Sequence, residues 1–218
     1  MLADQAAGLR RRGAQQPLAC VLCFFDSANA TEQFAHALRR LGQVCLLVDV
    51  CGRLFAASPA RNLFDWKQQI ERGQLHTQPF AYGEAWYAPG VRADEPALRR
   101  AAQGYDQVVF DQGSSPVDLT LMPDALHAVV IEIQPTHESM LRAYTLLKTL
   151  SHANGVLSNV GLLGDPVACD QVQAACSHFL EPAFTQTLIN AACEDDAIVS
   201  LAVRMVGEGT GPLARYIK

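Results

Sequence analysis

An almost continuous apolar run, a helical pattern and a second apolar run follow one another between residues 18 and 50, and this order constrains the fold most. The first run, at residues 18–25, reads LACVLCFF, which is typical of a parallel strand covered on both faces. Apolar residues between positions 34 and 41 then repeat at helical spacing, and a second strand follows at residues 44–50. A strand, a helix and a strand so closely joined predict a right-handed crossover within a parallel sheet.

The helix of this unit has recognisable ends. Asn29 and Glu32 resemble a capping box, so the helix is expected to begin at Asn29. Gly42 is suited to the turn that ends it.

The same alternation continues towards the C-terminus. Further strands are predicted at residues 85–90, 107–113, 127–135 and 155–160, and further helices at residues 62–73, 95–104, 136–155, 165–179, 195–205 and 211–217. In the helix that starts near residue 136, the expected apolar stripe is Met140, Leu141, Tyr144, Leu147 and Leu150. The predicted fold class is α/β, with a single doubly wound, mostly parallel sheet and helices on both faces.

Composition narrows the class of protein. Half of the 218 residues are hydrophobic and 18% are charged, so the chain can bury a sizeable core and is not a disordered protein. The net charge of -5 argues against broad nucleic-acid binding, which requires a basic face. No apolar run approaches the ~18 residues of a transmembrane helix. The histidines show no metal-ligand spacing, so no metal site is predicted.

The chain has seven cysteines, scattered through the predicted strands and helices, which is typical of reduced thiols in a cytoplasmic protein. Cys20 and Cys23 form a C-x-x-C pair, a spacing that also occurs in metal and redox sites. On an extended strand these two positions point to opposite faces. The strand therefore favours two small buried side chains over a shared site.

Polar residues gather where the predicted parallel strands end, which is where such folds bind ligands. The candidate residues at this edge are Asp26, Ser27, Asp49, Cys51, Asp111, Gln112, Gly113, Gln134, Pro135 and Thr136. Two apolar strands, LLVDV and VVFDQG, end in an acidic residue, the usual form of a carboxylate that holds magnesium through water. Taken alone, either acid is more often a helix cap or a solvated strand end than a metal-binding carboxylate.

Three segments together resemble the MinD/ParA class of deviant Walker ATPases, which have a P-loop NTPase fold. They are LGQVCLLVDVCG at residues 41–52, YDQVVFDQGSS at residues 105–115 and VVIEIQPTHESMLRAYTLLKTL at residues 129–150. The N-terminal segment DQAAGLRRR, at residues 4–12, is similar to the DQAxxLR segment of the flagellar regulator family FlhG, also called FleN or YlxH. The resemblance spans nearly the whole chain.

The sequence departs from that class at the phosphate-binding loop. The class has glycines whose backbone N–H groups cradle phosphates, and lysines that neutralise them. Here the turn after the first strand reads FFDSANATE, Ser27 falls near the position of the lysine, and Asp26 adds a negative charge. No glycine lies between Gly13 and Gly42, and the first lysine is Lys67.

Other nucleotide-site positions are partly kept. The D-x-D motif of the class becomes Asp49-Val50-Cys51, while Asp111 matches the Walker B acid and Asn159 matches an asparagine that faces the adenine. The interpretation is a pseudo-ATPase that needs no cofactor, with a vestigial nucleotide site. Its residues are Asp26, Ser27, Asp49, Asp111 and Asn159.

The resemblance implies a role for the N-terminus. In FlhG proteins the DQAxxLR segment is a short helix that docks on FlhF, a GTPase of the signal-recognition-particle type, and its glutamine orients the attacking water. Carried over, Gln5 orients the water, Asp4 caps the helix, and Leu9 and Arg10 make the docking contact. The same residues are also compatible with an ordinary amphipathic helix or a disordered tail. On the first interpretation, residues 1–15 form an activator-like segment and residues 16–218 the α/β domain.

The leading hypothesis is therefore a non-catalytic regulator of flagellar placement or number that acts through a protein partner. It is expected to be cytoplasmic, to be recruited to a cell pole by that partner, and to be a monomer or an ATP-independent dimer. The segment GTGPLARYIK at residues 209–218 offers too little apolar surface for stable membrane anchoring. Two alternatives stay open: an ATPase with a nucleotide site rebuilt from Asp49, Asp111 and Asn159, and a MinD-like scaffold of another polar or secretion system.

Overall fold

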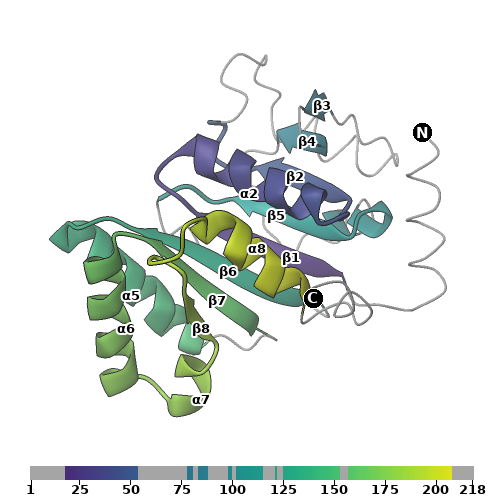
Figure 1. Cartoon of the computed structure of the whole chain (residues 1–218). Helices are drawn as coiled ribbons and strands as arrows, with labels where there is room; N and C mark the ends of the chain where they lie inside the picture. The colour runs from purple at the N-terminus through teal and green to yellow at the C-terminus, as the bar shows by residue number, and fades with distance from the viewer. Residues whose placement is uncertain are drawn as a thin grey trace.

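The computed structural model describes residues 18–53, 78–80, 83–87, 98–99, 102–114, 121, 125–152 and 157–207 (Figure 1). Its described strands form one eight-stranded sheet in the order β3-β4-β2-β5-β1-β6-β7-β8. Every pairing in the sheet is parallel except that between β3 and β4. The predicted fold class, a doubly wound and mostly parallel α/β sheet, is confirmed.

The bounds of the elements follow the chain order. They are β1 (Ala19–Phe24), α2 (Ala28–Arg40), β2 (Cys45–Asp49), β3 (Gln78–Phe80), β4 (Gly83–Tyr87), the short 3-10 helix η1 (Ala102–Gly104), β5 (Gln107–Asp111), β6 (Leu126–Ile133), α5 (His137–Ser151), β7 (Leu157–Gly164), α6 (Pro166–Phe179), α7 (Pro182–Thr185), β8 (Leu188–Asn190) and α8 (Ala197–Gly207).

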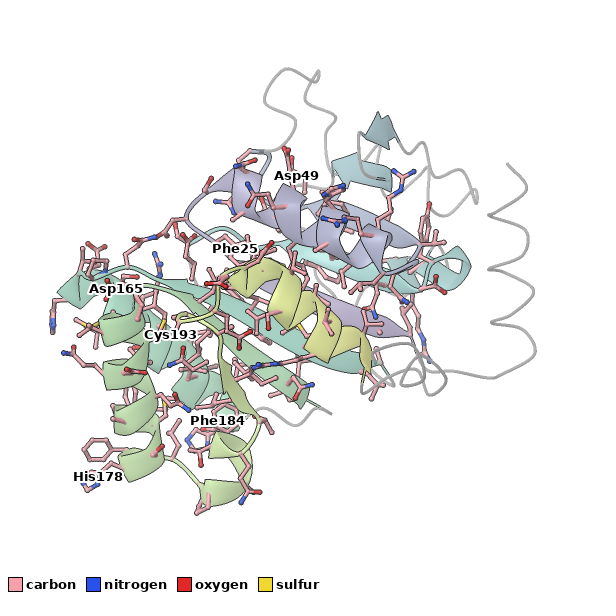
Figure 2. All side chains as sticks on the ribbon, in the orientation of Figure 1. Phe25, Asp49, Asp165, His178, Phe184 and Cys193 are labelled. Carbon is pink, nitrogen blue, oxygen red and sulfur yellow. The ribbon has the colours of Figure 1, made fainter. Side chains whose placement is uncertain are left out.

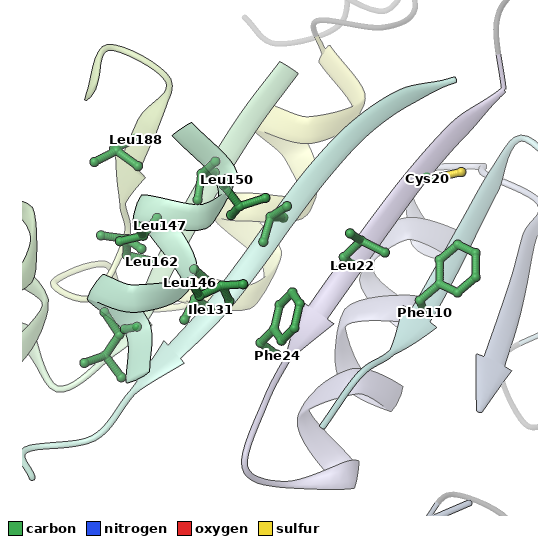
Figure 3. Close-up of a cluster of buried hydrophobic side chains, with 14 of the residues drawn as sticks. Cys20, Leu22, Phe24, Phe110, Ile131, Leu146, Leu147, Leu150, Leu162 and Leu188 are labelled. Atoms are coloured by element: carbon green, nitrogen blue, oxygen red, sulfur yellow. The ribbon is translucent and has the colours of Figure 1, made fainter. Parts of the chain in front are cut away.

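Helices cover both faces of the sheet. On one face, α2 and α8 lie side by side across the strands (Figure 1), and their apolar side chains pack on a cluster that includes Val21, Leu47 and Val130. On the other face, α5 and α6 contact each other and pack on a second cluster, part of which Figure 3 shows around Leu22 and Ile131. The continuous apolar runs of the central strands supply both clusters, as expected for strands buried on two sides.

The first strand shows this division directly. Cys20 belongs to the cluster under α5 and α6, whereas Cys23 belongs to the cluster under α2 and α8. The two thiols therefore lie on opposite faces of the sheet, as the sequence predicts. No group of three or more potential metal ligands occurs among the described residues.

Two local predictions need correction, and some short elements were not predicted. The helix after β1 begins at Ala28 with Ser27 as its N-cap, so Asn29 lies inside the first turn and does not cap it. Leu141 is more than half exposed, because the buried face of α5 runs through Ser139, Ala143, Leu146, Leu147 and Leu150. The short strands β3 and β8 were not predicted from the sequence. The helices predicted at residues 62–73 and 211–217 lie outside the described residues.

None of the helices in the described ranges is both long enough and apolar enough to cross a membrane.

Gly164 permits a close approach at the end of β7. Its φ of +114° is a conformation that other residues rarely adopt, and a Cβ built on it would lie 2.3 Å from the carbonyl oxygen of Ile133. Asp165, the N-cap of α6, donates its backbone N–H to that same oxygen at 2.9 Å. A side chain at position 164 would therefore disturb both the pairing of β7 with β6 and the start of α6.

We expect Gly164→Ala to lower the free energy of unfolding by about 2 kcal/mol or more, since backbone strain and overpacking add. Gly104→Ala is the matched control, because a Cβ there meets no atom within 4 Å. Urea unfolding of both variants measures the difference. Equal stability of the two variants would contradict the assigned packing.

His127 is buried at the start of β6, with 1% of its surface exposed. Burial lowers the pKa of this imidazole to about 4. In the unfolded chain a histidine takes up its proton below about pH 6.5. The His127 contribution to the free energy of unfolding is therefore complete above about pH 6.5, and it is lost as the pH falls through the folded-state value.

We expect His127→Gln to flatten the pH dependence of the unfolding free energy between about pH 6.5 and 4. The slope should fall by up to the amount that corresponds to about one proton taken up on unfolding. Urea unfolding at several pH values in this window measures the slope. Parallel curves for the two proteins would show that His127 is not the group that titrates.

Candidate functional site

The carboxyl ends of β2, β5, β1 and β6 meet at one edge of the sheet, and this carboxyl edge gathers most of the predicted site. In Figure 2 the labelled residues Asp49, Phe25 and Asp165 mark it, at the ends of β2, β1 and β7. Asp49 and Asp111 are paired in register on neighbouring strands, and neither has exposed surface. The fold thus places two buried carboxyl groups next to each other.

Asp111 is held by two polar groups from other elements. The Arg53 guanidinium donates from Nε to Oδ2 at 2.7 Å and from Nη2 to Oδ1 at 2.5 Å. The Thr31 hydroxyl, from the first turn of α2, donates to Oδ1 at 2.7 Å. Two parallel N–H donations to one carboxylate form the strongest type of protein ion pair. The hydrogen bond to Asp111 correspondingly raises the pKa of Arg53.

Arg53 also reaches two further segments of the carboxyl edge. Its Nη1 donates to the backbone carbonyl oxygen of Asp26 at 3.0 Å, and its own backbone N–H donates to Asp49 Oδ1 at 3.2 Å. One side chain and its peptide group therefore tie together the ends of β2 and β5 and the turn after β1.

The turn after β1 is held from the other side as well. The backbone N–H of Asp26 donates to Glu132 Oε2 at 2.8 Å, and Arg142 of α5 donates from Nη2 to Asp26 Oδ1 at 3.0 Å. Glu132 Oε1 accepts from Gln134 Nε2 at 2.9 Å. Both the backbone N–H and the carboxylate of Asp26, in the turn after β1, are therefore bound by other side chains of the same protein.

Three of the remaining predicted residues have local structural roles. Thr136 caps α5 by accepting from the Ser139 backbone N–H at 3.2 Å. Gly113 has a φ of +64°, and a Cβ on it would lie 3.0 Å from Cys51 Sγ. The backbone N–H of Gln112 donates to the Cys23 carbonyl oxygen at 3.0 Å.

The carboxyl edge is rich in negative charge, and its titratable groups reflect this. Burial, and next the charge of Asp111, raises the pKa of Cys51 and also that of Glu32 on α2. A raised pKa keeps the Cys51 thiol protonated, so it is not an activated nucleophile.

The structure brings four of the five predicted vestigial-site residues to this edge: Asp26, Ser27, Asp49 and Asp111. It does not bring Asn159 there. Asn159 is buried within β7, and in the pairing of β7, β6, β1 and β5 it lies level with Val109 and three strands away from β5. The predicted activator residues Asp4, Gln5, Leu9 and Arg10 lie outside the described residues.

Four residues of the carboxyl edge were missed from the sequence: Thr31, Arg53, Glu132 and Arg142. One had a usable signal, because Glu132 is the single charged residue in the apolar run VVIEI. The others had none, since the carboxylates that their side chains bind lie 58 to 116 residues away along the chain.

No protein-family model matches this sequence, and no curated protein matches it significantly. Among solved structures, the chain is similar to a ParA family ATPase from Chlorobium tepidum, with 16% identity, a TM-score of 0.54, and coverage of 89% of this chain and 94% of that one. It is also similar to MinD in the MinC:MinD cell division complex of Aquifex aeolicus, with 17% identity, a TM-score of 0.50, and coverage of 91% and 99%. The pNOB8 ParA structure bound to nonspecific DNA gives 11% identity, a TM-score of 0.54, and coverage of 88% and 100%.

At these identities the likeness shows the fold, which is that of MinD/ParA-type ATPases. It leaves the kind of partner open, because one of these neighbours is seen with the protein MinC and another with DNA.

A nucleotide with its magnesium ion is the ligand that this fold suggests for the carboxyl edge. The described residues do not fit it. Both carboxylate oxygens of Asp111 accept from Arg53, so a magnesium ion approaching them would meet a positive charge that is already bound there. The turn after β1 presents Phe25, Asp26 and Ser27, where a phosphate nest would need glycines and a cation.

The hydrogen bond between Thr31 and Asp111 gives a test of this geometry. We expect Thr31→Val to lower the free energy of unfolding by about 1–3 kcal/mol, since it removes a donor from a buried charged acceptor without changing the side-chain shape. Thr145→Val on the exposed face of α5 is the control, with an expected change within about 0.5 kcal/mol. Chemical denaturation compares them; equal changes would argue against the bond.

Proposed function

We propose that this chain is a MinD/ParA-like scaffold that acts through protein–protein contact and does not hydrolyse ATP. More specifically, it is a regulator of flagellar placement or number of the FlhG type. The observation that carries the proposal is the ion pair between Arg53 and Asp111, which engages the carboxylate that an ATPase of this fold needs for its metal.

The chemistry of phosphoryl transfer supports the first part. Catalysis of that reaction rests on positioning and on positive charge around the phosphates. At this carboxyl edge the positive groups Arg53 and Arg142 are already paired with Asp111 and Asp26. Asp26 stands in the turn where a phosphate would lie, and its carboxylate would repel one.

The N-terminal segment supports the second part. Residues 4–12 read DQAAGLRRR, which is similar to the activating segment of FlhG proteins. In this proposal Gln5 enters the active site of a GTPase partner, where its amide accepts from the attacking water and donates to a nearby oxygen. Asp4 caps the segment, and Leu9 and Arg10 bind the partner's surface. The partner is an SRP-type GTPase of the FlhF kind.

One observation favours a second candidate function. Asp49 and Asp111 lie side by side with Thr31 in contact, an arrangement that could still hold a cation if Arg53 moved away. That would make the chain an ATP-binding protein with a rebuilt site. Calorimetric titration with magnesium-ATP separates the two functions, because saturable binding would support the ATPase and contradict our proposal.

The main prediction concerns GTP turnover by a purified FlhF-type GTPase. We expect the full chain to raise turnover by about tenfold or more, because an oriented water is worth at least this much in such sites. Gln5→Ala should return turnover to the unstimulated rate while circular dichroism shows an unchanged fold.

Gln15→Ala is the matched control, since it makes the same substitution in the same segment outside the DQA motif, and it should keep full stimulation. Stimulation that survives Gln5→Ala would overturn the activator role. Absence of stimulation by the unaltered chain would point to another polar or secretion system. Saturable DNA binding in fluorescence anisotropy would point to a nucleic-acid partner.

A further inference from the structure

The environment of Arg53 resembles that of a bound metal ion. Its guanidinium contacts three oxygen atoms, namely both carboxylate oxygens of Asp111 and the carbonyl oxygen of Asp26. A second carboxyl group, that of Asp49, accepts from the backbone N–H of the same residue. Carboxylate and carbonyl oxygens are the ligands that hard divalent cations prefer in proteins.

The burial of these acids makes a cation necessary at this position. Asp49 and Asp111 are both without exposed surface, and they are neighbours in register on β2 and β5. Two buried carboxylates this close repel each other unless a positive charge compensates them. Arg53 is partly exposed, with 22% of its side-chain surface open, so its charge enters the carboxyl edge from the solvent side.

We propose that Arg53 is a built-in cation of the carboxyl edge, whose guanidinium occupies a latent divalent-cation site formed by Asp111, Asp49 and the carbonyl oxygen of Asp26. A guanidinium cannot lose its proton in a protein, and its fork geometry matches a carboxylate. While Arg53 is bound there, the site is closed to free metal ions without any nucleotide or partner. This property concerns the edge itself and holds whatever partner the N-terminal segment binds.

The geometry also gives Arg53 a positioning role. Its contacts join the loop after β2, the end of β5 and the turn after β1, three segments that a metal ion and its ligands would otherwise hold together. Arg142 completes the arrangement on the α5 side of Asp26, but it touches neither Asp49 nor Asp111 in the contacts of the described residues. The two arginines are thus a matched pair for experiment.

The test is a gain of function. In the full chain, Arg53→Gln removes the positive charge and leaves room beside Asp111, so we expect saturable Mn²⁺ binding at least about tenfold tighter than in the unaltered chain. Electron paramagnetic resonance of free Mn²⁺ measures the binding, with no nucleotide present. Adding Asp111→Asn to Arg53→Gln should abolish it, because the main carboxylate ligand is then lost.

Arg142→Gln is the control, and it should bind no more Mn²⁺ than the unaltered chain. If Arg53→Gln does not fold by itself, Mn²⁺ should restore its circular dichroism spectrum, because a cation that binds only the folded state drives folding. Three results would overturn the proposal: an Arg53→Gln protein that neither binds Mn²⁺ nor is refolded by it, equally tight binding to the unaltered chain, or binding that survives the added Asp111→Asn. None of these depends on GTPase stimulation, so the two proposals fail separately.

Discussion

A fully buried carboxylate must be compensated from within the protein, and of the two such groups at the carboxyl edge of this sheet, Asp49 and Asp111, the second has the larger set of partners from other elements. Its compensation comes from Thr31 on α2 and from Arg53 in the loop after β2, so meeting one electrostatic requirement fixes the positions of two separate segments. Arg53 then extends the same network to the backbone of Asp26. The arrangement of the whole edge follows from the need to keep one charge at the end of β5 stable.

The parallel sheet creates this requirement. Parallel strands end at a common edge, and there the fold gathers the residues that follow each strand. In our proposal, side chains of this chain take the electrostatic roles that a nucleotide and a metal have in ATPases of the same fold. Arg53 and Arg142 supply positive charge, and Glu132 accepts from the backbone N–H of the turn after β1. A shared fold therefore predicts the arrangement of strands and helices, whereas the chemistry of the site depends on the side chains that are present.

Local patterns predicted most of the scaffold and part of the edge. Long apolar runs identified β1, β2, β5 and β6, because strands buried on both faces leave little other choice of residue. The three-residue strand β8 is too short to carry such a pattern, and the start of α2 depends on how the chain leaves β1. The apolar stripe of α5 failed at Leu141 because the helix packs on β6 and α6 through a face that periodicity alone does not select. Asn159 matched a family position by its neighbours in sequence, yet the length of β7 keeps it inside the sheet.

The same physical reason explains why the sequence pointed to Asp111 and not to Arg53. An acid that ends an apolar strand is visible in the sequence, since a charge is unusual next to a core. A partner that lies 58 residues away in a loop leaves no local trace. When Arg53 is not considered, Asp111 is interpreted as a remnant of a nucleotide site. With Arg53, Asp111 has a sufficient structural reason to be there, because it anchors Arg53 and the loop after β2 whether or not a nucleotide ever binds. A motif acid is therefore weak evidence for catalysis when the protein itself binds its oxygens, and at this edge Arg53 binds both oxygens of Asp111.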